Sequence, residues 1–173
     1  MRSVLPIASM DLLDRFLGHD AWATEQLLGI CAQLADDELD RPFDIGHQTI
    51  RRTLDHIIHN MEIWSSLMAN DPIERASDAS ISAMTRRLEV ASARLGTIAR
   101  QTADSGGWDE MWYDHLENPP RNKRFGTAIA HVITHSMHHR AQLLYMLRLT
   151  GITDLPEGDV FSWETQNRGR TNG

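Results

Sequence analysis

Four of the chain's nine histidines fall within nine residues, at positions 131, 135, 138 and 139. If this segment is helical, His131, His135 and His139 lie on one stripe, because residues four apart sit above one another on a helix. Two imidazoles spaced in this way can bind one metal ion. Several buried imidazoles without a metal would leave ring nitrogens that all need partners. The spacing therefore favours a metal site, with His138 flanking it.

A third ligand must come from another segment, because a catalytic metal usually takes three protein ligands and keeps one position open. The stretch LDHIIHNMEIW offers His56 and His59 in the middle of an apolar helical pattern. The spacing does not decide which of the two is the third ligand. The remaining histidines, His19, His47 and His115, are interpreted as ordinary hydrogen-bonded or surface residues, the last two because they fall in predicted loops.

Other common catalytic motifs are absent from the sequence. It has no phosphate-binding glycine loop, no GxSxG elbow and no CxxC pair, and HSMHH lacks the glutamate that a zinc protease places after its first histidine. Peptide hydrolysis is therefore disfavoured. Cys31 is the only cysteine and lies among apolar residues, so it is predicted to be buried and not nucleophilic. Three imidazoles and a solvent molecule suit Zn(II), Ni(II) or Fe(II) equally well.

The apolar residues of four long stretches recur at helical spacing. We predict helices over roughly 9–35, with Ser9 as N-cap, and over 48–70, 79–103 and 125–150. The segment WDEMWYDHLENPPRNKR before the last helix holds either two short strands or an irregular loop. The pattern predicts one all-α domain over residues 1–173, an antiparallel four-helix bundle with a long connection before the last helix. Such bundles build sites from side chains of facing helices.

Charge and hydropathy narrow the choice of partners and compartment. The formal net charge of −7 disfavours nucleic acid, whose binding depends mainly on clustered Lys and Arg. Charged residues interrupt every apolar run before it could cross a bilayer, and the first residues lack the pattern of an export signal. We therefore expect a cytoplasmic protein without a membrane or nucleic-acid partner.

Three stretches, HDAWATEQLL, TIRRTLDHIIHNMEIW and HVITHSMHHRAQLLYMLRLTG, together with LPEGDVFSW, resemble the DinB-like proteins and the related bacillithiol- and mycothiol-dependent S-transferases. Members are four-helix bundles, often dimers, that hold a divalent metal with solvent completing its shell. The resemblance implies a metal triad of His56, His135 and His139, and so selects His56 over His59. Ala141 replaces a common glycine, and His19 stands where an aromatic residue is more usual.

The resemblance implies a metal-activated small thiol that attacks a small electrophilic substrate, with Trp64 or Trp112 shaping the substrate space. This metal-dependent S-transferase is the leading hypothesis. A non-catalytic metal-binding stress-response module is nearly as well supported, and metal-activated water acting as a hydrolase comes third. Asp20 or Asp55 could orient a second ring nitrogen of a ligand. A homodimer is expected from the family alone.

Overall fold

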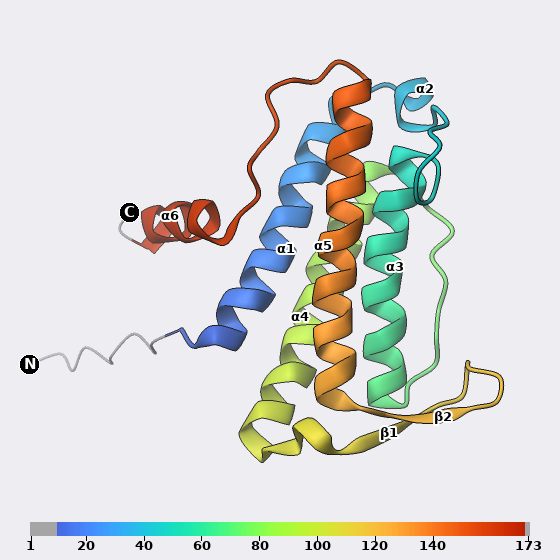
Figure 1. Ribbon diagram of the computed structural model, residues 1–173, viewed down its shortest axis with the longest axis vertical. Helices are drawn as coiled ribbons and strands as arrows, with labels where there is room; N and C mark the ends of the chain where they lie inside the picture. The colour runs from blue at the N-terminus through green and yellow to red at the C-terminus, as the bar shows by residue number, and fades with distance from the viewer. Residues whose placement is uncertain (1–9, 172–173) are drawn as a thin grey trace, which may run out of the picture.

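A computed structural model describes residues 10–171, which are mostly helical, as predicted (Figure 1). Two short strands before the last long helix form an antiparallel hairpin, which is one of the two structures the sequence left open. The elements are α1 Leu12–Cys31, α2 Asp36–Leu39, α3 Ile50–Ala69, α4 Ile81–Ser105, the 3-10 turn Gly107–Asp109, β1 Met111–Asp114, β2 Arg121–Arg124, α5 Phe125–Leu149 and α6 Val160–Thr171.

Side-chain caps set where three of the long helices begin. Asp11 accepts a hydrogen bond from the backbone N–H of Asp14 at the start of α1, and Thr49 and Ser80 cap α3 and α4 in the same way. The first helix therefore begins at Leu12 and not near residue 9. The predicted cap Ser9 lies outside the described residues.

Helices α3 and α4 run in the same direction, which corrects the prediction that successive long helices alternate. Arg87 of α4 reaches Asp55 of α3, and Arg94, about two turns further along α4, reaches Ser66, about three turns further along α3. The chain from 70 to 80 therefore returns along the whole length of α3 before α4 begins (Figure 1). Eleven extended residues reach about 36 Å, enough to pass a 20-residue helix of about 30 Å.

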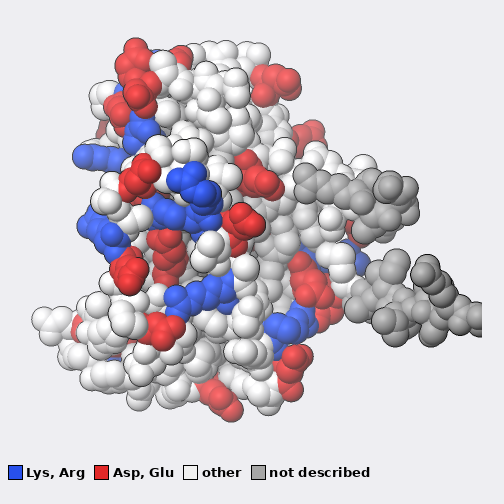
Figure 2. Space-filling view, turned by 180° about the vertical axis from the view of Figure 1, so that it is seen from behind, with Lys and Arg blue, Asp and Glu red and all other residues white. Residues whose placement is uncertain are grey.

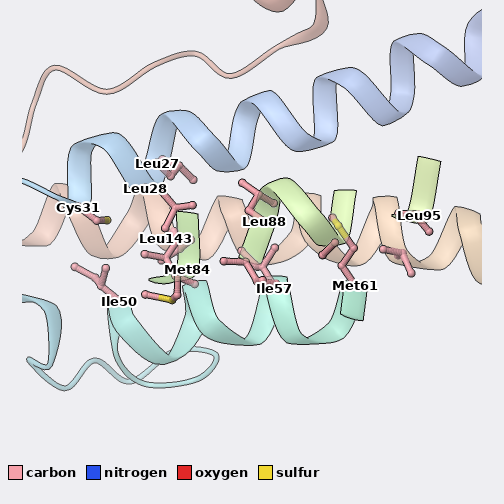
Figure 3. Packing of buried hydrophobic residues seen from close by; sticks show 14 of the residues in the cluster. Leu27, Leu28, Cys31, Ile50, Ile57, Met61, Met84, Leu88, Leu95 and Leu143 are labelled. Carbon is pink, nitrogen blue, oxygen red and sulfur yellow. The ribbon is translucent and has the colours of Figure 1, made fainter. Parts of the chain in front are cut away.

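The interior is lined by apolar residues from all four long helices (Figure 3). Full burial of one such side chain stabilises the fold by about 1.5–3 kcal/mol, so these contacts hold α3 and α5 in place beside each other. The labelled members are Leu27, Leu28, Cys31, Ile50, Ile57, Met61, Met84, Leu88, Leu95 and Leu143.

A buried ion pair joins α1 to α5 next to the predicted metal ligands. Arg140 donates to Asp20 Oδ1 at 2.5 Å and to Thr24 Oγ1 at 3.2 Å, and all three side chains are buried. Burial raises the pKa of Asp20, while the facing guanidinium opposes that rise. Because Arg140 directly follows His139, this pair restricts the rotation of α5 and fixes which face turns toward α3.

No helix was predicted after residue 150. The structure has a helix there, α6, which packs on α1. Trp163 is buried against Trp22, and a Cβ at Gly18 would lie 2.7 Å from the Trp163 ring. The signal in the sequence is weak, because a single buried tryptophan holds this helix and its other side chains show no apolar stripe.

Candidate metal centre

Three imidazoles from α3 and α5 meet where these helices face each other. His56 Nε2 lies 3.4 Å from His135 Nε2, which lies 3.2 Å from His139 Nε2. Nitrogens bound at about 2.0–2.1 Å to one tetrahedral ion are about 3.3 Å apart, so both distances fit a shared metal ion. The three histidines that the resemblance implied thus form one cluster, in which His135 Nε2 is in contact with both of the other rings.

The alternative to a metal site is a polar cluster held by hydrogen bonds alone, and such a cluster would leave ring nitrogens without partners. A single proton can serve only one contact between the three Nε2 atoms, so the cluster offers more acceptors than donors. His135 Nδ1 is also buried and has no hydrogen-bond partner among the described residues. A cation between the Nε2 atoms would satisfy all three, and the residues present therefore fit a divalent metal.

Gln142 fixes the tautomer of His139. Its Oε1 lies 2.8 Å from His139 Nδ1, and an amide oxygen only accepts, so Nδ1 carries the proton. In the neutral ring the lone pair is then on Nε2, the atom that faces His135. The amide nitrogen of Gln142 donates to His138 Nε2 at 3.0 Å, which fixes the amide orientation. The predicted candidate His138 thus supports the centre through Gln142.

The three rings are uncharged at neutral pH, as metal ligands must be. Burial, together with the charges of the neighbouring histidines, lowers the pKa of His56 to about 4. The same two causes lower the pKa of His135 to about 4, and burial lowers the pKa of His139. None of the rings therefore has to lose a proton before it binds a cation at pH 7.

His47, which the sequence analysis interpreted as an ordinary loop residue, lies on this cluster. Its ring stacks on His56 with centroids 3.7 Å apart, and one nitrogen each of His47, His56 and His139 lie within 4.8 Å of one another. Loop residues have no periodicity that could reveal which way they face. The only signal was Gly46, which lets the loop turn directly beside α5.

Gly46 permits that approach because it has no side chain. Its φ of +53° lies in the left-handed region, and a Cβ there would lie 2.2 Å from Gln142 Oε1. The backbone of the loop therefore rests on the same amide that orients His139. This contact places His47 over His56, and it couples the loop to the ligand set.

The other histidines considered in the sequence, His19, His59 and His115, have different surroundings from the triad. His59 was the alternative third ligand; its Nδ1 lies 3.3 Å from Glu62, which pairs with Arg87 of α4, so the ring faces away from α5. His115 is exposed in the hairpin connection. His19 donates to the Gly158 carbonyl at 2.7 Å, which agrees with its interpretation as a hydrogen-bonded residue.

The two aspartates considered as orienting groups pair with arginines. Asp20 faces Arg140 and Asp55 faces Arg87, whereas the orienting contact to His139 comes from an amide. His139 therefore has a neutral hydrogen-bond partner, which would not offset the positive charge of a bound cation. The spacing of Gln142, three residues after His139, predicts that it continues the histidine stripe, but its role as the orienting group was not predicted.

A cavity of about 550 Å³ adjoins the triad through His131. The His131 ring lies 5.1 Å from the His135 ring and 4.9 Å from Trp64, centroid to centroid. Lys123 Nζ lies 4.6 Å from the centre of the Trp64 ring and also pairs with Asp114. The cavity is lined on its polar side by Glu117, Asn122, Lys123, Arg124, Thr127 and His131.

The two tryptophans proposed as pocket walls have different positions. Trp64 lines the cavity, whereas Trp112 is 7% exposed and packs edge-on against Trp64 with ring centroids 5.8 Å apart. Cys31 is fully buried, and burial raises its pKa to about 12, so its thiol is not a nucleophile. This confirms the interpretation of Cys31 drawn from the sequence.

The fold and the facing histidines define a class, namely helical proteins with a site that can hold a metal ion. The comparison with protein families then gives the family. The model of the DinB family matches residues 9–168, nearly the whole chain. The chain therefore belongs to the DinB family. No curated protein matches it.

Two further observations concern the hydropathy of the helices and the charge of one face. Among residues 10–171, no helix combines the length and the apolar character needed to cross a membrane. On the face shown in Figure 2, Lys and Arg side chains are interleaved with Asp and Glu. That face presents no continuous basic patch of the kind that binds a phosphate backbone.

Proposed function

We propose that this protein binds one divalent metal ion through His56, His135 and His139 and acts as a metal-dependent thiol S-transferase on small electrophiles. The observation that carries the proposal is the contact of three neutral Nε2 atoms beside a cavity large enough for a small molecule. We also infer that the four long helices form the family's four-helix bundle and that the protein is a homodimer.

The ligand set favours thiol activation. A divalent ion held only by neutral imidazoles keeps its full positive charge and would lower the pKa of a bound thiol, which supplies a thiolate at neutral pH. The chain's own residues keep the ligands uncharged by burial, and Gln142 keeps the lone pair of His139 on the ligating nitrogen. The proton that the thiol loses on binding would be released to solvent, because the lone pairs of the three rings would be used for the metal.

The thiol has to come from outside the protein. Cys31 is the only cysteine, and it is buried in the core with its pKa raised to about 12. The cavity beside His131 gives the second reactant a place next to the triad, with the Trp64 ring as an apolar wall and Lys123 above that ring. An electrophile with an aromatic or conjugated group suits the Trp64 wall of this cavity.

The test is thiol binding by the loaded, full-length protein. Zinc-loaded wild type is titrated calorimetrically with glutathione, cysteine, coenzyme A, bacillithiol and mycothiol, and turnover is followed with monobromobimane as electrophile. Saturable binding of one thiol and accelerated bimane transfer, both abolished in His135→Ala, support the proposal. Metal binding without thiol binding or transfer would contradict it.

One observation favours a second function. His47 adds a fourth imidazole beside the triad, and four protein ligands that close the shell are typical of structural zinc sites. In that case the protein is a non-catalytic metal-binding module. Its melting temperature would then depend strongly on the metal, because a closed structural site contributes its binding free energy to folding.

A further inference from the structure

His47 lies beside two of the three triad histidines, His56 and His139. A ring nitrogen of His47 lies within 4.8 Å of ring nitrogens of His56 and of His139, and these two rings belong to the triad. A metal ion bound at His56 and His139 would therefore also be within reach of His47. Stacking at 3.7 Å on His56 and a centroid distance of 5.1 Å to His139 place the ring beside both.

We propose that His47 is a fourth, exchangeable ligand, which occupies the coordination position that the triad leaves open until an external ligand displaces it. The inference rests on the proposed metal at the triad, and it adds a control of access to that metal. His47 is then an internal competitor of the thiol, supplied by the segment 41–49 between α2 and α3.

The backbone that carries His47 differs from the backbone that carries the triad histidines. His56, His135 and His139 stand in the middle of 20- and 25-residue helices that pack along the core. His47 stands in a turn that closes on itself, where Phe43 N–H donates to the Gln48 carbonyl at 2.6 Å and Gln48 N–H donates to the Ile45 carbonyl at 2.9 Å. The turn can therefore shift as one unit while the three helical ligands stay in place.

The backbone of the turn is set for this position of the ring. Both neighbours of His47 adopt positive φ, +53° at Gly46 and +71° at Gln48, a combination that a relaxed loop would not choose for a glutamine. The contact of Gly46 with Gln142 ties this geometry to His139. His47 is directed at the cluster by the local backbone, and the partial exposure of its side chain leaves room for it to swing away.

The competition between His47 and an external ligand has a measurable effect on the affinity for that ligand. If the imidazole of His47 occupies the position in about 90% of molecules, an external ligand binds about tenfold more weakly than it would without that imidazole. Removal of the ring should strengthen the binding of the external ligand by this factor. A residue that only packs against His56 would have no such effect.

The experiment uses Co(II)-loaded full-length protein with azide as the external ligand, so that it does not depend on thiol transfer. Visible absorption of Co(II) reports the number and type of its ligands, and azide titration reports the open position. His47→Ala removes the ring, whereas His47→Phe keeps a ring for stacking on His56 but has no ligand atom. His115→Ala removes an exposed histidine in the hairpin connection and is the matched control.

The proposal predicts that both His47 variants change the Co(II) spectrum in the same way, and that His47→Ala binds azide about tenfold more tightly while His115→Ala equals wild type. A His47→Phe spectrum identical to that of wild type would overturn it, as would equal azide affinities in wild type and His47→Ala. Failure of the wild type to bind Co(II) at all would overturn the proposed function as well, and is thereby distinguished from failure of the competition alone.

Discussion

Gln142 is the residue that most directly prepares a triad histidine for metal binding. Its Oε1 accepts a hydrogen bond from His139 Nδ1–H, which leaves the lone pair of the neutral ring on Nε2. In Gln142→Leu this orientation is lost, and we predict that zinc affinity falls about 10- to 100-fold with the fold retained. Competition with a chromophoric chelator measures the affinity. Gln101→Leu, on an exposed position of α4, is the control and should bind zinc like wild type.

The lowered histidine pKa values make the stability of the metal-free protein depend on pH. Folding lowers the pKa of His56 and of His135 from 6.5 to about 4, so between these values the unfolded chain binds more protons than the folded protein. Stability therefore is complete above about pH 6.5 and declines as the pH falls toward 4. Thermal melts of the metal-free protein from pH 7.5 to 4.5 measure this decline.

A double variant tests whether the triad causes the decline. In His56→Gln/His135→Gln both titrating rings are gone, so the melting temperature should fall less over the same pH interval than in wild type. Parallel curves for the two proteins would show that other groups are responsible. Circular dichroism at pH 7.5 confirms that the variant is folded before the comparison is made.

At the residue scale, the sequence predicted three histidines that the structure brings into contact, but it did not predict every member of the cluster. The spacing of His135 and His139 indicates a shared helix face, whatever the rest of the fold does. The choice of His56 over His59 needed the resemblance, because both positions lie near the edge of the apolar stripe. Gln142 could have been found from its spacing, whereas the position of His47 depends on a turn that has no periodic signal.

At the scale of elements, the turn before α3 depends on Gly46. Alanine there has to adopt a left-handed φ, which costs about 1–2 kcal/mol, and its Cβ would collide with Gln142. We predict that Gly46→Ala lowers the free energy of unfolding by at least this amount and moves His47 off His56. Urea unfolding measures the loss.

Gly29→Ala is the matched control for that prediction. Gly29 lies within α1, where an added Cβ would meet nothing within 4 Å. Alanine in a helix interior is favoured over glycine by about 1 kcal/mol, so this variant should be more stable than wild type. If both glycine variants shifted stability in the same direction, the proposed constraint at Gly46 would be wrong.

Helical periodicity predicted the four long helices but not their directions. A stripe of apolar residues shows which face is buried, and it is unchanged when a helix is reversed. The parallel course of α3 and α4 is set by the extended segment 70–80, whose polar sequence gave no indication that it spans the length of a helix. The small helix α2 and the helix α6 were also missed, because each buries only one large apolar side chain in the described part of the chain.

At the scale of the whole molecule, the buried pair of Asp20 and Arg140 joins α1 to the helix that carries two triad ligands. Replacing one partner leaves the other charge buried without compensation. We predict that Asp20→Leu costs about 3–5 kcal/mol in the free energy of unfolding. The exposed pair of Arg94 and Asp71 is the control, and Asp71→Leu should cost less than about 1 kcal/mol.

The double variant Asp20→Leu/Arg140→Leu separates the charge from the packing. Because it leaves no unpaired charge, it should be more stable than Asp20→Leu alone in the same urea unfolding experiment. A double variant that loses the sum of both single losses would show that the two side chains act independently. In that case the pair would not be what fixes α5 against α1.

The central claim is that His56, His135 and His139 together hold a divalent metal ion, and elemental analysis tests it most directly. Protein purified without a histidine tag is compared with His56→Ala, His135→Ala and the exposed-site control His115→Ala after loading with zinc, nickel or iron(II). We predict stoichiometric metal in wild type and in the control, and its loss from both triad variants while their helical content is unchanged. Metal retained by the folded triad variants, or absent from wild type under every loading condition, would contradict the account.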